Sequence, residues 1–319
     1  MRAVVTGGTG LIGRALVAEL CRLGWEVDCL GRHPPEAPRP GVRHHQVDLN
    51  QPASLTAGIR ASKDASALFH LAAVMPHHSP APDDAEYVRA NVLASLEIFR
   101  AAMEWGIERV VYASGVSVIG TPAQQPVTES HPTAPRSAYT ISKLGGELFA
   151  EYLRNTRGLK VTSLRLASPY GPGMSPSSVL PRFAMAALRG LPLTWFGSGS
   201  RSQNFVHVTD AANACMLAAT RGAGGVYNIG GPESISMKAL AQLLVDLTPG
   251  TGSSATASGR ADPQEDERWE VSLTRARDEL GYVPAVRLRD GLKDYLERMR
   301  TEARRETGET AISHSPPTT

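Results

Sequence analysis

Short hydrophobic runs and longer amphipathic segments alternate through the first half of the chain. The short runs are rich in β-branched and other apolar residues, and in the longer segments apolar positions recur at helical spacing. Strands that alternate with helices in this way pair in parallel, so the pattern predicts an α/β fold with a doubly wound parallel sheet. The predicted strands are Arg2–Thr6, Glu26–Leu30, Arg43–Val47, Ala67–Leu71, Arg109–Ala113 and Lys160–Leu166, and the predicted helices are Leu11–Leu23, Asp84–Trp105 and Ala138–Asn155.

The texture of the chain changes after residue 168, where prolines and glycines interrupt the alternation. We expect residues 1–168 to form the main domain, with segments near 196–230 returning to it. Residues 169–305 are expected to form a smaller C-terminal lobe that binds substrate. Within that lobe the Gly-, Ser- and Thr-rich stretch Pro249–Gly259 is predicted to be a flexible connection. The polar end, residues 306–319, is predicted to be disordered.

Composition narrows the possible partners. The net charge of the 319 residues is +2, which gives no electrostatic reason to expect nucleic acid or a membrane surface. No apolar run reaches the length of about 20 residues that spans a bilayer, and the amino-terminal sequence lacks the pattern of a signal peptide. The three cysteines and nine histidines show no metal-ligand spacing. We therefore expect a cytoplasmic protein with a small-molecule substrate and no metal.

A glycine triplet follows the first predicted strand and opens the first predicted helix. Gly7, Gly10 and Gly13 stand at the spacing GxxGxxG, with Leu11 and Ile12 inside the motif. In this context the first glycine permits a tight turn, the second lets the backbone approach a pyrophosphate, and the third lets helix and strand pack closely. The amino end of the helix then supplies N–H groups and a positive dipole to the anion. The motif predicts a Rossmann-type domain that binds NAD(P).

The end of the second predicted strand bears on the choice of nicotinamide cofactor. An NAD-specific Rossmann domain places a carboxylate there, which accepts hydrogen bonds from the ribose 2′-hydroxyl. Here the strand ends at Gly31 and Arg32, and Asp28 lies three residues too early. Arg32 can form a charge-assisted bond with a 2′-phosphate. The sequence therefore favours NADP over NAD.

Tyr139 and Lys143 carry the clearest chemical signal. Positions four apart on a helix lie one above the other on the same face, so a phenol and an ammonium can act there on one substrate oxygen and one ribose. Tyrosine titrates near 10 when unperturbed. A neighbouring Lys⁺ and an oxidised nicotinamide would both favour the phenolate and lower that pKa. We expect Tyr139 to be the acid and base of a hydride-transfer reaction.

These motifs, together with Ser142 and Glu147 beside the pair, resemble the extended short-chain dehydrogenase/reductase family of the NAD-dependent epimerase/dehydratase type. The resemblance covers almost the whole chain, to about residue 296. It implies that Lys143 holds the ribose hydroxyls of the cofactor. It also implies that Asp48 and Leu49 meet the adenine, and that the segment containing Leu71, Ala72 and Ala73 runs along the cofactor.

The resemblance implies a third catalytic group, a Ser or Thr just past the fifth strand, and here the chain departs from the family. Counted back from Gly120, that position is Gly115. Ser117 or Ser114 is expected to supply the hydroxyl instead, with Ser117 slightly favoured. Sugar 4,6-dehydratases of the family would carry Asp-Glu where this chain has Val116 and Ser117, and nucleotide-sugar decarboxylases would need the Glu. Both of these chemistries are disfavoured.

Two further departures concern the substrate. Ser168 stands where the family has an Asn that contacts substrate, and Gln203 stands where it has an Arg that meets nucleotide phosphates. Arg201, Arg260 or Arg268 could neutralise a diphosphate instead; the alternative is that each is a solvated surface arginine.

We predict NAD(P)-dependent redox chemistry at a sugar carbon, with a nucleotide sugar as the expected substrate. Epimerisation through a transient ketone and reduction of a keto-sugar both remain open. A reductase of a non-sugar ketone is the first alternative, and a non-catalytic dinucleotide sensor is the second. The resemblance also implies a possible homodimer through the helices near Asp84–Trp105 and Ala138–Asn155.

Overall fold

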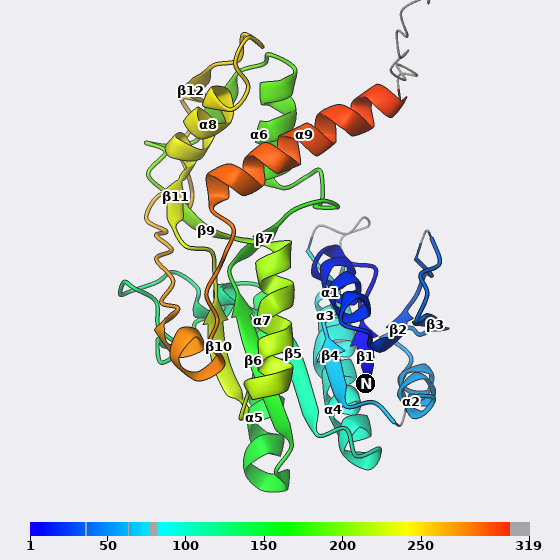
Figure 1. The fold of residues 1–319 in the computed structure, drawn as a ribbon. Coiled ribbons are helices and arrows are strands. Elements are labelled where there is room, and N and C mark those ends of the chain that lie inside the picture. Colours follow the sequence, from blue (N-terminus) through cyan, green and yellow to red (C-terminus); the bar gives the residue numbers. More distant parts are fainter. Residues whose placement is uncertain (36, 63, 77–81, 307–319) are drawn as a thin grey trace, which may run out of the picture.

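The predicted parallel sheet is present in the computed structural model, which describes residues 1–35, 37–62, 64–76 and 82–306 (Figure 1). The sheet has seven strands in the order β10-β6-β5-β4-β1-β2-β3, and its neighbouring strands are parallel. The doubly wound α/β fold is therefore confirmed. The strands are β1 (Arg2–Thr6), β2 (Glu26–Gly31), β3 (Val42–Gln46), β4 (Ala67–His70), β5 (Arg109–Gly115), β6 (Lys160–Leu166) and β10 (Gly225–Ile229).

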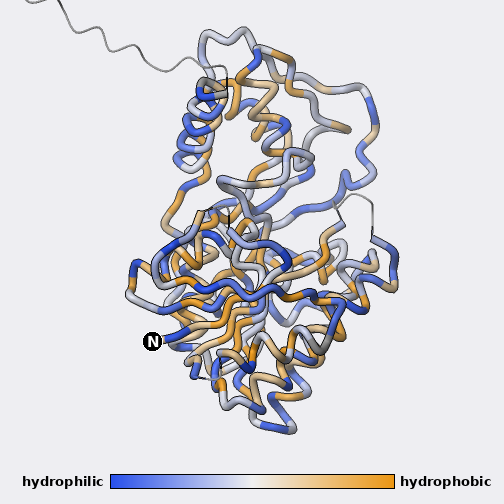
Figure 2. The backbone as a smooth tube through the Cα atoms, turned by 90° about the vertical axis from the view of Figure 1, so that its right-hand side faces the viewer, coloured by the Kyte–Doolittle hydropathy of each residue, from blue (hydrophilic) through white to orange (hydrophobic). Residues whose placement is uncertain are grey.

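Helices cover both faces of this sheet, and each face has its own hydrophobic core (Figures 1 and 2). On one face pack α1 (Leu11–Arg22) and α7 (Val208–Arg221). On the other face pack α2 (Pro52–Arg60), α4 (Ala94–Glu104) and α5 (Ala138–Arg157). The segment Asp84–Trp105, predicted as one helix, runs as α3 (Asp84–Tyr87), the π-helix η1 (Val88–Leu93) and α4.

Local signals fix the two ends of α5. The Ser137 hydroxyl accepts a hydrogen bond from the Thr140 N–H at 3.2 Å, and the Thr140 hydroxyl bonds back to the Ser137 N–H, which completes a capping box. At the other end Gly158 adopts a left-handed conformation with φ 73°, a common helix terminator. The helix that carries the predicted catalytic pair is thus held at both ends by its own sequence.

The C-terminal lobe, built from α6, α8, α9 and two small sheets, has a third core. Its helices are α6 (Val179–Leu188), α8 (Met237–Asp246) and α9 (Leu288–Glu306). Its strands are β7 (Ser168–Tyr170), β9 (Ser202–His207) and β11 (Ser234–Ser236) in one sheet, and β8 (Leu193–Trp195) and β12 (Ala255–Ala257) in the other. The short helices η2 (Val116–Ile119) and η3 (Ala276–Leu280) lie on the main domain.

The prediction of a flexible connection over Pro249–Gly259 is wrong for its second half. Residues Ala255–Ala257 form β12, which pairs in parallel with β8 and matches Ala255 to Leu193. The partner strand lies far away in the sequence, so composition alone could not reveal it. At the end of the chain Glu306 is the last residue of α9, and residues 307–319, predicted to be disordered, lie outside the described part.

The order of the strands defines where a ligand can bind. It reverses between β1 and β4, and crevices at such switch points, beyond the carboxyl ends of the strands, are where open α/β sheets bind ligands. The C-terminal lobe lies beyond the same edge of the sheet (Figure 1). Among the described helices, none combines the length and apolar character needed to cross a membrane.

Candidate active site

The glycine motif forms the tight turn that was predicted between β1 and α1. Gly7 has φ +72°, and a Cβ atom there would lie 2.8 Å from the backbone nitrogen of Ala72. A Cβ on Gly13 would collide with the carbonyl oxygen of Gly7, so these two positions require glycine. Helix α1 begins at Leu11, which is followed by Ile12, and Gly10 before it provides no side-chain cap. Its first N–H groups can therefore bind an anion in the crevice.

The tip of β2 carries no carboxylate. Asp28 is buried within the strand and accepts hydrogen bonds from Arg43 at 2.8 Å and from His45 at 3.0 Å. Burial alone would raise the pKa of Asp28, but the bonds from Arg43 and His45 hold it below its ordinary value. A carboxylate so engaged cannot reach a ribose. Arg32, just beyond the strand, is exposed.

Two further predicted cofactor segments follow β3 and β4, at the carboxyl ends of these strands. The carboxylate of Asp48 accepts the Asn50 N–H at 2.9 Å, and so closes a turn. Leu49 packs beside a small cluster that includes Val74 and Tyr87 and that Tyr139 also borders. Leu71, Ala72 and Ala73 follow β4 directly, and the Ala72 N–H donates to the Thr6 hydroxyl at 3.2 Å.

Tyr139 and Lys143 lie on the first turns of α5, and both polar ends are deep in the protein. Tyr139 is half-buried, with its ring 6.1 Å from that of Tyr87. Burial, with a smaller contribution from Tyr87, raises the pKa of Tyr139 to about 12. Burial lowers the pKa of Lys143 to about 7, against the opposing effect of Glu147. The Lys143 ammonium nitrogen lies 4.3 Å above the ring of Tyr112.

This electrostatic state differs from the sequence-based expectation that Lys143 lowers the pKa of Tyr139. Loss of hydration is the largest cause of both pKa shifts, because both side chains are surrounded by protein at the first turns of α5. In the structure burial therefore favours the neutral phenol form of Tyr139.

The hydroxyl next to Gly115 comes from Ser117. A Cβ atom built on Gly115 would lie 3.3 Å from the Ser117 oxygen, so that hydroxyl borders the space of the missing side chain. The Ser114 hydroxyl is closed to solvent and has no hydrogen-bond partner among the described residues. A substrate can therefore approach Ser117, which is half-buried, more readily than Ser114.

Glu147, one turn beyond Lys143, forms a buried ion pair. Arg165 on β6 donates to the Glu147 carboxylate at 2.8 Å, and the two side chains are only 6% and 4% exposed. Arg165 also donates to the carbonyl oxygen of Glu129 at 3.2 Å. The pair therefore ties α5, the helix with the predicted catalytic pair, to the sheet.

The predicted substrate residues are only partly brought together. Ser168 pairs with Phe205 in the β7–β9 register, two residues from Gln203. Arg201, however, donates to Asp262 at 2.9 Å and to Gln264 at 3.0 Å, so a carboxylate already neutralises it.

The other two candidate arginines differ in whether other groups of the protein already bind their guanidinium groups. Arg268 donates to the Ser200 hydroxyl at 2.7 Å and to backbone carbonyls, whereas Arg260 is exposed. Of the three arginines, Arg260 keeps its guanidinium in the solvent.

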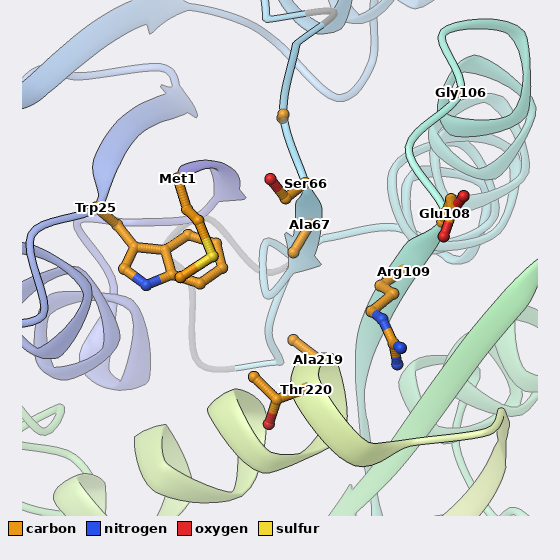
Figure 3. Close-up of a pocket in the computed structure, with 10 residues that line it drawn as sticks. Met1, Trp25, Ser66, Ala67, Gly106, Glu108, Arg109, Ala219 and Thr220 are labelled. Atoms are coloured by element: carbon orange, nitrogen blue, oxygen red, sulfur yellow. The ribbon is translucent and has the colours of Figure 1, made fainter.

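A hollow of about 420 Å³ lies elsewhere, at the amino ends of the central strands (Figure 3). Trp25 and Met1 line one side of it and Arg109 another. It is at the opposite edge of the sheet from the glycine turn, and none of the predicted site residues lines it. The hollow is thus separate from the cofactor crevice.

The comparison with known families decides the relationship. The model of the NAD dependent epimerase/dehydratase family matches residues 3–230, which include the glycine turn, Ser117 and the predicted catalytic residues Tyr139 and Lys143. The chain belongs to this family. The resemblance to the extended short-chain dehydrogenase/reductases, and with it the status of an enzyme, is confirmed.

Individual members of the family are similar over most of the chain. A dTDP-glucose 4,6-dehydratase of Streptomyces griseus is 34% identical over 227 residues, which is 70% of this chain and 69% of the relative. The structure of a UDP-glucose 4-epimerase of Thermotoga maritima with UDP-glucose has a TM-score of 0.86 at 26% identity, and covers 95% of this chain and all of that one. The UDP-glucose 4-epimerase of Thermus thermophilus, in complex with NAD, has a TM-score of 0.82 at 27% identity and covers 94% and 99%.

Sequence reasoning missed one group of polar residues in this family member. Asn91, Ser95 and Ser142 are buried between α4, η1 and α5, and they bond to one another or to backbone. The available signal was an Asn and a Ser on the apolar side of the predicted helix Asp84–Trp105. Only the packing of that helix against α5 shows what they contact.

Proposed function

We propose that the protein is an NAD(P)-dependent oxidoreductase or epimerase that acts on a carbinol or ketone carbon of a nucleotide sugar. The observation that carries this proposal is the position of Tyr139. It lies on α5 one turn before Lys143, and it borders the same small cluster as Leu49 and Val74 at the cofactor crevice. A proton donor and a dinucleotide site thus meet at one edge of the sheet.

The chemistry divides among three side chains. A nicotinamide bound in the crevice supplies the hydride acceptor or donor. Tyr139 gives its proton to the carbonyl oxygen in the direction of reduction, and takes it back in the direction of oxidation. Ser117 donates a hydrogen bond to the same oxygen and orients it. Lys143, in its charged form, favours the phenolate during oxidation and binds the ribose hydroxyls.

Epimerisation or reduction is favoured over dehydration. The relatives include dehydratases and epimerases, and both named substrates are sugars attached to a nucleoside diphosphate. Elimination of water needs an acid that protonates the leaving hydroxyl and a base that removes a proton from the adjacent carbon. Here the segment after β5 supplies Val116 and Ser117 instead. We include NADP as the favoured cofactor, because Arg32 is exposed at a β2 tip that lacks a carboxylate; the epimerase of Thermus thermophilus, by contrast, is in complex with NAD.

A reductase of a non-sugar ketone is the second candidate. It is favoured by the pairing of Arg201 with Asp262, because an arginine that already has a carboxylate partner is poorly available to a diphosphate.

A homodimer through α4 and α5 is part of the proposal. Five large apolar side chains are exposed on the helices near this face, and pairing of two copies would remove them from water. These side chains are Val88, Leu93, Ile141, Leu148 and Tyr152.

The proposal is tested with purified protein and a panel of UDP- and dTDP-hexoses and their 4-keto derivatives, each with NAD⁺, NADP⁺, NADH or NADPH. Chromatography of the sugar nucleotides identifies an epimer or a reduced product, and absorbance at 340 nm reports net reduction. Tyr139→Phe is the control for chemistry at this site. Turnover of simple ketones without turnover of any sugar nucleotide would instead support the second candidate.

A further inference from the structure

A chain of buried polar side chains connects the cofactor side of the sheet with the catalytic helix. It begins at Thr6, the last residue of β1, and passes through His70 at the end of β4. It continues through Ser95 on α4 and Asn91 on η1 to Ser142 on α5. Each of these five side chains is at most 1% exposed. A polar group this deep is retained only if it is hydrogen-bonded, and all five are.

The hydrogen bonds among Thr6, His70 and Ser95 fix the tautomer of His70. Ser95 lies 2.5 Å from the carbonyl oxygen of Asn91, which can only accept, so the Ser95 hydroxyl donates there. The bond between Ser95 and His70 Nε2, at 2.9 Å, must then be donated by the histidine. His70 Nδ1 is left as an acceptor, and the Thr6 hydroxyl lies 2.7 Å from it.

The charge state of the ring agrees with this assignment. Burial, with a smaller contribution from Lys143, lowers the pKa of His70 to about 3, so the ring stays neutral at physiological pH. A protonated His70 would have a hydrogen on Nδ1 as well, and the Thr6 hydroxyl would then have to accept that bond instead of donating it. The ring is therefore a fixed bridge with one donor and one acceptor.

The hydrogen bonds of Asn91 and Ser142 reach the backbone of the first turn of α5. Asn91 clamps Val74 by two bonds, accepting its N–H at 2.7 Å and donating to its carbonyl oxygen at 3.0 Å. The same Asn91 amide donates to the Ser142 hydroxyl at 3.0 Å, and Ser142 donates to the carbonyl oxygen of Tyr139 at 2.7 Å. The segment after β4 and the first turn of α5 are thus held by a single side chain.

A second branch from His70 reaches Lys143. The ring of His70 lies 5.5 Å from the ring of Tyr112, and the Tyr112 hydroxyl donates to the carbonyl oxygen of Lys143 at 3.3 Å. The backbone carbonyl of Lys143 is thus bound by Tyr112, whose ring contacts His70. The backbone carbonyl of Tyr139 is bound by Ser142, which is connected to His70 through Asn91 and Ser95.

We propose that His70 is a positioning residue for the reaction. Its Nε2–H tautomer joins the carboxyl ends of β1 and β4, where the cofactor crevice lies, to the first turn of α5, and so sets the distance between Tyr139 and the nicotinamide site. The π-helix η1 is part of this device, because its wider turn holds Asn91 between Val74 and Ser142. The inference rests on the proposed function of Tyr139.

The test compares kcat, KM and cofactor Kd for His70→Phe, which keeps a ring but removes both bonds, and for Ser95→Ala. Ser163→Ala is the matched control, since Ser163 is also buried but lies on β6 outside the chain. The assays use UDP-glucose or dTDP-glucose with NAD⁺ and NADP⁺. We expect kcat to fall about 10- to 100-fold in His70→Phe and Ser95→Ala with little change in KM, because a displaced catalytic group loses rate rather than binding.

Rescue separates positioning from stability. His70→Gln restores an N–H donor toward Ser95 and is expected to recover part of kcat, whereas a purely structural role would lower the melting temperature and leave kcat of the folded protein unchanged. Wild-type kcat in Ser95→Ala, or a loss no larger than in Ser163→Ala, overturns the inference even if His70→Phe does not fold.

A second readout does not need a substrate. Absorbance difference spectra between each variant and its Tyr139→Phe counterpart report the titration of the Tyr139 phenol. Ser95→Ala removes the bonds of Ser95 to His70 and to the backbone carbonyl of Asn91. If Asn91 then shifts and loosens its hold on Ser142, water enters beside α5, and the pKa of Tyr139 should fall from about 12 toward its ordinary value. An unchanged titration counts against the inference. If Tyr139→Phe itself retains wild-type turnover, the proposed function fails as well; if only the Ser95 and His70 variants retain it, the inference fails alone.

Discussion

Charged and polar groups are arranged differently around α5 and in the C-terminal lobe. On α5 the Glu147 carboxylate pairs with Arg165 on β6, and the two side chains are 4% and 6% exposed. In the lobe, Arg201 pairs with Asp262 on a loop, where its side chain is 17% exposed. From this difference we expect α5 and the sheet beside it to be more rigid than the loops that carry Arg201 and Asp262.

The largest effect is expected at the catalytic residue itself. Tyr139→Phe should fold and bind cofactor like the wild type but lose about 10²- to 10⁴-fold in turnover, the usual contribution of a positioned acid–base group. Steady-state kinetics and cofactor titration measure the two quantities. Unchanged turnover would show that the reaction does not depend on Tyr139, and α5 would then not differ from the lobe in its importance for the reaction.

The two ion pairs test the difference in rigidity directly. Arg165→Met leaves Glu147 charged in a dry environment and should reduce the free energy of unfolding by about 3 to 5 kcal/mol. Arg201→Met in the lobe should cost less, about 1 to 3 kcal/mol, because the Asp262 carboxylate keeps the hydrogen bond from the Gln264 N–H.

Urea unfolding followed by circular dichroism measures both variants. The double variant Glu147→Leu/Arg165→Met is the control, and it should recover most of the loss, since no charge is left unpaired. Equal costs at the two sites would show that the lobe is as rigid as the sheet.

The burial of Lys143 on α5 should make the stability of the protein depend on pH. Its pKa is lowered to about 7 in the folded protein from an ordinary value of 10.5, so the unfolded chain binds more protons between these values. Stability of the wild type should therefore rise with pH across this window. Lys143→Met lacks the buried charge, and at pH 7 it should be about 1 to 3 kcal/mol more stable than the wild type. Thermal unfolding from pH 7 to 10 should show this gap closing, and a constant gap would contradict the burial of a charged Lys143.

A smaller effect separates the two serines after β5. Ser117→Ala should lower turnover about 10-fold through the loss of one hydrogen bond to the reacting oxygen, while Ser114→Ala should stay near the wild type because its hydroxyl is closed to solvent. Kinetics of the two variants side by side provide the check. The reverse order would place the substrate oxygen on the other side of Gly115.

The smallest effect concerns an exposed loop of the main domain. Arg32→Ala should weaken NADP⁺ binding about 2- to 5-fold, the scale of a solvent-exposed charge pair, and leave NAD⁺ binding unchanged. Intrinsic fluorescence titrations measure both affinities. Tighter binding of NAD⁺ than of NADP⁺ by the wild type would contradict the preference for NADP and would favour an epimerase that keeps its cofactor.

The predictions from sequence succeeded where the cause is local. The period of the hydrophobic pattern located the strands and helices of the main domain, because burial of one face of an element is written in consecutive residues. Gly13 was recognisable for the same reason, because a side chain there would meet Gly7 and Gly8, whereas a side chain at Gly7 would meet the backbone of Ala72 after β4. The prediction failed at Ala255–Ala257, whose partner strand β8 is distant in sequence.

The electrostatics of the site were also beyond the sequence. A Tyr and a Lys four residues apart indicated a catalytic pair, but the spacing does not say how deeply each is buried. Desolvation is a property of everything packed around a group, so the raised pKa of Tyr139 and the lowered pKa of Lys143 required the assembled structure.

The sequence by itself determined the doubly wound sheet, the glycine turn and the helix that presents Tyr139 and Lys143, because each depends on residues close together in the chain. Tertiary structure alone decided that Arg201 is paired with Asp262, that Ser117 borders Gly115, and that His70 lies between Thr6 and Ser95. These contacts depend on strand register and helix packing between distant segments. The energy of a hydrogen bond or an ion pair depends on distances and burial that only the folded chain establishes.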